Sequence, residues 1–186
     1  RYIPRGAALK HALSGVADRR YTRSVVIRDT GLGPDLPNVD PDLNTLAELY
    51  RAQGHYAKAE PLSKRALEIL GAALGPDLPS VALSLNNLAG LYDTQGHYAK
   101  AEPLYKRSLK IREAALGPDH PKVATGLNNL AELYRAQGHY AKAEPLSKRA
   151  LEIFEAALGP DHPSVARSRN NRPGLADTQG QDATES

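Results

Sequence analysis

The ten residues QGHYAKAEPL stand at positions 53–62 and recur without change at 95–104 and 137–146. Each copy begins 42 residues after the one before it. An identical stretch at a fixed spacing of this size indicates an array of structural repeats, because such arrays grow by whole units. The length of 186 residues therefore reflects a number of repeats rather than a number of compact domains.

The residues around this stretch predict two helices in each unit. Apolar residues fall at positions i, i+3, i+4 and i+7 before the second copy, as Leu85, Leu88, Ala89 and Tyr92. Gly96 then ends this helix, and a second periodic segment follows it. A Leu-Gly-Pro-Asp sequence ends the second segment and begins at Leu32, Leu74, Leu116 and Leu158. One unit is therefore a shorter helix A, a tight turn, a longer helix B and a Pro-rich link.

Small residues recur on both helices of each unit and predict close contact between them. They are Ala47, Ala89 and Ala131 in helix A, and Ala59, Ala101 and Ala143 in helix B. A helical hairpin of this kind cannot cover both of its apolar sides alone, so neighbouring copies must cover them. The predicted fold is all-α, a solenoid of helix-turn-helix repeats that stack into a right-handed superhelix.

A proline interrupts the pattern of each helix B, at Pro61, Pro103 and Pro145. Proline removes an amide donor and crowds the preceding turn of a helix. Because the apolar pattern continues in phase on both sides, we expect a modest bend rather than a break. A proline that is merely tolerated in an early turn is an equally good interpretation.

The repeat pattern also predicts the organisation of the chain. Three full units should occupy 40–163 as one solenoid, after a degenerate repeat at 1–39 that consists mainly of one helix at about 17–31. Residues 164–186 should form a degenerate capping helix and a disordered tail. The chain begins with Arg1 rather than Met, which indicates a fragment or a processed form of a longer protein.

Arginine replaces leucine in the predicted capping helix. Arg167, Arg169 and Arg172 stand where an earlier unit has Leu83, Leu85 and Leu88. We expect this helix to be short, to end before Pro173, and to point its Arg side chains toward water.

Composition argues against several classes of function. The 24 Lys and Arg residues and 21 Asp and Glu residues are mixed along the helices, whereas nucleic-acid binding usually needs a dense basic face. No apolar run approaches the ~20 residues that cross a bilayer. Cysteine is absent, so disulfides and thiolate metal sites are excluded and the compartment is left open. We predict no nucleic-acid partner, no membrane contact and a cytoplasmic location.

No catalytic or metal-binding pattern is present. The sequence lacks a Gly-rich phosphate loop, a His-Glu-x-x-His pair and a Gly-x-Ser-x-Gly elbow, so we predict no enzymatic activity and no cofactor. The histidines of adjacent copies should lie about 10 Å apart, too far for one metal ion to bridge. The repeated histidines and glutamates are therefore assigned structural roles at turns, links and helix starts. These residues are His55, His97, His139, His120, His162, Glu60, Glu102 and Glu144.

Four motifs occur in a fixed order: LNNLAxLY, QGxYxxAEPL, RALxI and LGPDHP. Together they resemble the 42-residue type of tetratricopeptide repeat found in kinesin light chains, and the resemblance covers residues 40–165. It implies a stack whose A helices line a concave groove. It also implies protein–protein interaction, in which that groove binds a peptide or a partner protein.

The same resemblance implies particular contact residues. Asn87 and Asn129 match the second Asn of LNNLA, which faces a cargo-peptide groove in kinesin light chains, and Arg112 matches an Arg that also contributes. This chain has Thr45 in place of that Asn in its first unit, and Thr125 in place of a groove Lys. The other two units carry Leu70 and Phe154 where the second has Arg112.

Further polar side chains lie on the A helices away from the Leu and Ala stripe. An Asn side chain offers both a donor and an acceptor, which suits it to the backbone of an extended peptide, although a solvated helix face is the alternative. These additional candidates are Asn44, Asn86, Asn128, Arg51 and Arg135.

Two other functions stay open from the sequence. Poorly capped ends would allow the array to self-associate through its end helices, as a homo-oligomeric scaffold. The repeats would alternatively be the sensor part of a larger signalling enzyme.

Overall fold

The structure is a computed structural model, and it describes residues 39–75 and 77–170. Within these residues the chain forms helices and no strand. The helices are α2 (Val39–Ala52), α3 (Tyr56–Leu74), α4 (Pro79–Thr94), α5 (Tyr98–Leu116), α6 (Pro121–Ala136), α7 (Tyr140–Leu158) and α8 (Pro163–Asn170). The prediction of an all-α repeat fold is confirmed. The helix expected at 17–31 and the tail expected at the end of 164–186 lie outside the described residues.

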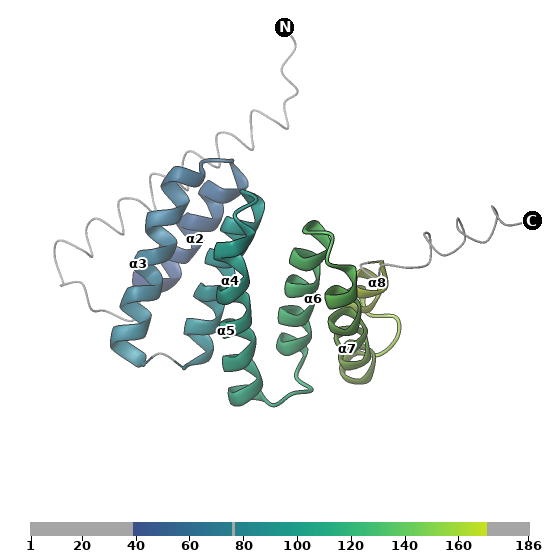
Figure 1. The fold of residues 1–186 in the computed structure, drawn as a ribbon. Helices are drawn as coiled ribbons and strands as arrows, with labels where there is room; N and C mark the ends of the chain where they lie inside the picture. The colour runs from purple at the N-terminus through teal and green to yellow at the C-terminus, as the bar shows by residue number, and fades with distance from the viewer. Residues whose placement is uncertain (1–38, 76, 171–186) are drawn as a thin grey trace, which may run out of the picture. The chain divides into compact units, whose positions relative to one another are not determined.

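The described residues divide into two compact units, one that ends at Leu91 and one that begins at Tyr92. In the first unit α2 packs along α3 (Figure 1). In the second unit α6 packs against both α5 and α7, and α8 packs against α7 (Figure 1). In the second unit successive helix pairs therefore cover one another, as the solenoid argument requires. The handedness of the superhelix stays a prediction.

The repeated QGH sequence forms the joint between helices A and B. Gly54 adopts a φ of 76°, a left-handed conformation that glycine reaches without strain. Its N–H donates to the carbonyl of Arg51 at 3.0 Å, and the N–H of His55 donates to the carbonyl of Tyr50 at 2.8 Å. These two bonds are those of a Schellman motif, and the rings of Tyr50 and His55 pack with centroids 6.2 Å apart. The same bonds recur at Gly96 and Gly138.

Histidine caps the A helices that follow the later links. The Nδ1 atom of His120 accepts a hydrogen bond from the N–H of Lys122 at 3.1 Å, and Pro121 occupies the first helical position. His162 accepts in the same way from the N–H of Ser164. The structural role predicted for these two histidines is confirmed.

Small residues line the contact between the paired helices. The predicted Ala positions are all buried, and Ala59, Ala101 and Ala143 are fully inaccessible. Around them each buried Val, Leu, Ile or Phe contributes about 1.5–3 kcal/mol to stability. The core of the second unit consists of Val123, Ala124, Leu127, Ala150, Leu151, Ile153, Phe154 and Val165.

Helix B continues through its proline in every copy. The helices α3, α5 and α7 contain Pro61, Pro103 and Pro145 without a break. The absence of a break is confirmed, and the modest bend stays a prediction. Beside the proline, Glu60 pairs with Lys64 at 2.7 Å and Glu102 with Lys106 at 2.6 Å, so these two carboxylates form ion pairs one turn along their own helices.

Two polar contacts tie successive hairpins of the second unit together. The hydroxyl of Tyr134 on α6 donates to Oε1 of Glu102 on α5 at 2.8 Å. Nη1 of Arg149 on α7 lies 2.8 Å from Oε1 of Glu113 on α5. These contacts join residues far apart in the sequence, so they fix the register of one hairpin against the next.

Candidate functional site

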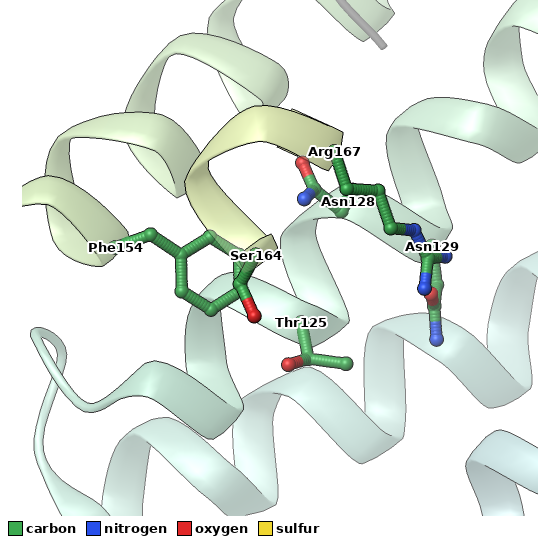
Figure 2. A pocket seen from close by; sticks show the side chains of 6 residues that line it. All are labelled: Thr125, Asn128, Asn129, Phe154, Ser164 and Arg167. Atoms are coloured by element: carbon green, nitrogen blue, oxygen red, sulfur yellow. The ribbon is translucent and has the colours of Figure 1, made fainter. Parts of the chain in front are cut away.

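A pocket of about 60 Å³ opens in the second unit between α6, α7 and α8 (Figure 2). A single buried water needs roughly 10–15 Å³ on this scale, so the pocket has room for several waters or a small side chain. It is lined by Thr125, Asn128 and Asn129 from α6, Phe154 from α7, and Ser164 and Arg167 from α8. Two of the predicted contact residues, Asn128 and Asn129, therefore lie in one pocket.

Asn128 is the most buried polar residue of the pocket, with 5% of its surface exposed. Its Oδ1 accepts a hydrogen bond from Oγ of Ser168 at 3.3 Å. Among the described residues its Nδ2 group has no hydrogen-bond partner. Because this group is not among the buried side-chain atoms without a partner, solvent reaches it, and the pocket offers an accessible amide donor to a ligand acceptor.

The helical register explains why the α6 side chains share one wall. Thr125, Asn128 and Asn129 stand at i, i+3 and i+4, which is one face of a helix. The hydroxyl of Thr125 donates to the carbonyl of Pro121 at 3.1 Å, so it is engaged by its own helix. Asn129 is half-buried. This wall thus presents amide groups rather than charges.

The remaining walls combine an aromatic ring with a cation. Phe154 is buried in the core of the unit and also lines the pocket. Arg167 exposes 67% of its side chain, and its Nη2 lies 3.5 Å from Oε1 of Glu132. This outward orientation agrees with the expectation that Arg residues of α8 face water. An exposed pair of this length contributes only ~0–1 kcal/mol, so Arg167 can exchange Glu132 for another acceptor at little cost.

A second carboxylate lies beyond Glu132. The pKa of Asp93, at the end of α4, is raised by burial and then by the negative charge of Glu132. Glu132 thus has a cation on one side and a carboxylate on the other.

Four predicted contact residues belong to the first unit. Nδ2 of Asn44 donates to Oγ of Ser84 at 2.8 Å, which links α2 to α4. Arg51 forms a hydrogen-bonded ion pair with Glu48 one turn earlier, at 2.8 Å. Asn86 and Asn87 are half-buried on α4. Asn44 and Arg51 are therefore engaged within their own unit.

The other two predicted residues lie in the second unit but do not line the pocket. Arg112 on α5 is buried, and its Nη1 donates to the carbonyl of Lys122 at 3.0 Å. Arg135 is half-buried near the end of α6. The structure thus brings Asn128 and Asn129 together and leaves Arg112 and Arg135 outside their pocket.

The sequence prediction did not include Phe154, Ser164 or Arg167 as site residues. The 42-residue register contains the signal that would have found two of them. Phe154 occupies in the third unit the position that Arg112 has in the second, and Arg167 occupies the position of Thr125. Positions equivalent to proposed contacts thus line the pocket even where the residue type differs.

The chemistry available in this pocket is that of binding. Its lining offers an aromatic face, amides, hydroxyls and one guanidinium, without a carboxylate or histidine. Across the described ranges, no three His, Cys, Asp or Glu side chains gather as a metal ion would require. Nor is any helix in those ranges both long and apolar enough to span a membrane.

Comparison with solved structures identifies similar folds. A kinesin light chain-like protein of Podosopora anserina with nearly identical TPR-like repeats superposes with a TM-score of 0.76 at 24% identity, covering 92% of this chain and 82% of that one. A second structure of that protein gives a TM-score of 0.74 at 23% identity, covering 97% and 90%. BtubC (BKLC) from P. vanneervenii gives 0.67 at 28% identity, covering 86% of this chain and 61% of that one.

Sequence comparison gives the family directly. No curated protein matches the chain. The family model described as tetratricopeptide repeat matches residues 41–114, 98–156 and 122–183, which together extend over most of the sequence. The 42-residue period, the paired helices and this match lead to one conclusion: the chain belongs to the tetratricopeptide repeat family.

Proposed function

We propose that this chain is a protein-interaction module that binds an extended peptide segment of a partner protein against its A helices. Stacked helical repeats are interaction scaffolds, and their curved faces are the surfaces that contact partners. The observation that carries the proposal is the pocket of the second unit, which is lined by both the Asn128 amide and the aromatic ring of Phe154.

The Asn128 amide favours a peptide ligand over an inert solvated face. Its Nδ2 is a solvent-reachable donor with no partner in the described residues, and a hydrogen bond from it to a peptide carbonyl would contribute about 0.5–1.5 kcal/mol. Phe154 offers apolar surface to a ligand side chain, and Arg167 offers a cation at the rim. One backbone group and one side chain of an extended peptide would thus be recognised together.

The remaining candidates are proposed contacts by register. Asn87 stands in its unit where Asn129 stands in the third, and Asn86 stands where Asn128 does. Asn44, Arg51 and Arg135 complete the proposed set on the A helices. Arg112 is proposed as a contact only when its side chain leaves the buried position described above.

A peptide-capture screen tests the proposal. The full chain, fluorescently labelled, is applied to an array of random extended peptides, and the captured sequences are ranked. The variant Asn87→Ala, Asn129→Ala is expected to lose most of the captured sequences, because each truncation removes an amide that bonds a peptide backbone.

Lys148→Ala provides the matched control, because Lys148 is exposed on α7 and does not line the pocket. It should capture the same peptides as the unmodified chain. If the double Asn variant also captures them equally well, the A helices do not form the binding surface. If no chain captures any peptide, the module does not bind extended peptides.

A further inference from the structure

Arg112 is buried to an unusual degree for a charged side chain. Only 6% of its surface is exposed, although arginine is rarely fully buried unless it is paired. Its Nη1 donates to one neutral acceptor, the carbonyl of Lys122. Within the described residues it forms no ion pair, and burial alone lowers the pKa of the guanidinium. The helix pair thus holds a cation whose remaining donors have no charged partner.

The space for this guanidinium comes from Gly126. This glycine is buried inside α6, where glycine is a poor helix former. A Cβ atom added there would lie 3.6 Å from Nη1 of Arg112 and 3.3 Å from Cδ1 of Leu109. Any side chain larger than a methyl group would therefore enter the volume that Arg112 occupies.

The equivalent positions 42 residues before and after provide an internal comparison. The position of Gly126 is occupied there by Ser84 and Ser168, and both serines are buried. The position of Arg112 is occupied by Leu70 and Phe154. Of these three pairs of positions, glycine therefore occurs in the one that has an arginine on the preceding helix B.

Leu109 does not explain the glycine. Its equivalents Leu67 and Leu151 are also leucines, yet the residues equivalent to Gly126 there are serines. Of the two side chains nearest to a Cβ atom at Gly126, the one that differs from the equivalent positions is therefore Arg112.

We propose that Gly126 is a positioning residue that keeps the Arg112 guanidinium withdrawn between α5 and α6, against the carbonyl of Lys122. A guanidinium held in this way presents little positive charge to a ligand until it leaves Gly126. The surface around α5 and α6 therefore attracts acidic groups less strongly than its sequence suggests. Residue 126 determines how far the Arg112 charge is exposed.

Chemical modification reads the position of Arg112 without any ligand. The folded full chain is treated with phenylglyoxal, digested with a protease that cleaves after Glu, and analysed by mass spectrometry. In the unmodified chain Arg112 should react far more slowly than the exposed Arg169. In Gly126→Ser the ratio of Arg112 to Arg169 modification should rise several-fold toward one. An unchanged ratio would overturn the proposal.

Ala124→Ser is the matched control. Ala124 is fully buried on the same helix, so this substitution also adds a hydroxyl group to the core. It does so away from position 126, where an added Cβ atom would contact Arg112. It should leave Arg112 protected. If Ala124→Ser exposes Arg112 as much as Gly126→Ser does, general loosening of the core explains the result and the positioning role is refuted.

A thermal-melting cycle gives a second, independent readout. Gly126→Ser should lower the melting temperature of the chain that contains Arg112, even though serine is the better helix former. In an Arg112→Leu background the same substitution recreates the pairing of Leu70 with Ser84, and it should not lower the melting temperature. Equal losses in both backgrounds would overturn the proposal. Neither experiment uses a peptide, so the outcome is independent of the proposed function.

Discussion

The bond between Tyr134 and Glu102 allows the contact between successive hairpins to be measured. Tyr134→Phe removes one hydroxyl and leaves the ring in the core. A hydrogen bond to a charged group contributes roughly 1.5–3 kcal/mol. Here Glu102 exposes 28% of its side chain and keeps Lys106 as a partner, so solvent screening reduces the expected loss to about 1 kcal/mol. For a chain of this size that corresponds to a fall in melting temperature of about 2–4 °C.

The effect should depend on pH in a defined direction. Hydrogen bonds from Lys106 and Tyr134 lower the pKa of Glu102 below its usual 4.5. A carboxylate with a lowered folded-state pKa stabilises the fold above its unfolded-state value, and the stabilisation is lost as the pH falls through the lowered value. The gap between Tyr134→Phe and the unmodified chain should therefore be full at neutral pH and shrink below pH 4.5.

The assay is urea unfolding followed by circular dichroism at about pH 7 and at about pH 3.5. Tyr140→Phe is the control. It removes the same hydroxyl group at a surface site, because Tyr140 is 58% exposed. It should unfold like the unmodified chain at both pH values. If Tyr134→Phe does so too, the Tyr134 hydroxyl does not hold the hairpins together and the reasoning fails.

Three further substitutions test local features. Leu78 is 41% exposed and occupies the position that His120 has one repeat later, where His120 caps α6. Leu78→His should therefore add about 0.5–1 kcal/mol to the free energy of unfolding in urea. No gain would refute the capping role. Asp93→Asn should raise the melting temperature by about 1–3 °C at neutral pH, because Asp93 has a pKa raised by burial and by Glu132. That gain should shrink as the pH falls through the raised folded-state pKa and vanish below 3.8, where Asp93 becomes protonated in both states; a pH-independent gain would contradict the assignment. Gly96→Ala places a side chain at a φ of 74° and should cost about 1–2 kcal/mol in the same unfolding assay; an unchanged midpoint would argue against a required left-handed residue.

The helix pairs could be predicted because their signals are local. Apolar spacing before Gly96 marks helix A, and the Gly-Pro sequences mark the end of helix B, so a single sequence contains both boundaries. The role of the small residues followed for the same reason, since Ala59 and Ala101 recur at one position of one helix. These features depend on residues within one unit.

The pocket was harder to predict because it combines three helices. Asn129 was found by its motif, whereas Phe154 looked like ordinary core and Arg167 looked like a solvated cap. Nothing local to Arg112 shows that it is buried. Its position depends on a side chain that is missing at Gly126 in the next helix, and pattern analysis of one helix cannot see such an absence.

The joint at QGH has a consequence for how such a protein can change. All of its backbone bonds connect residues that are five or fewer positions apart, as between His55 and Tyr50. A duplicated 42-codon stretch of DNA would thus bring a complete corner with it, ready to fold wherever it was inserted in phase. Gain or loss of whole units would be tolerated, while an insertion of one residue between Gln53 and Tyr56 would misdirect everything downstream.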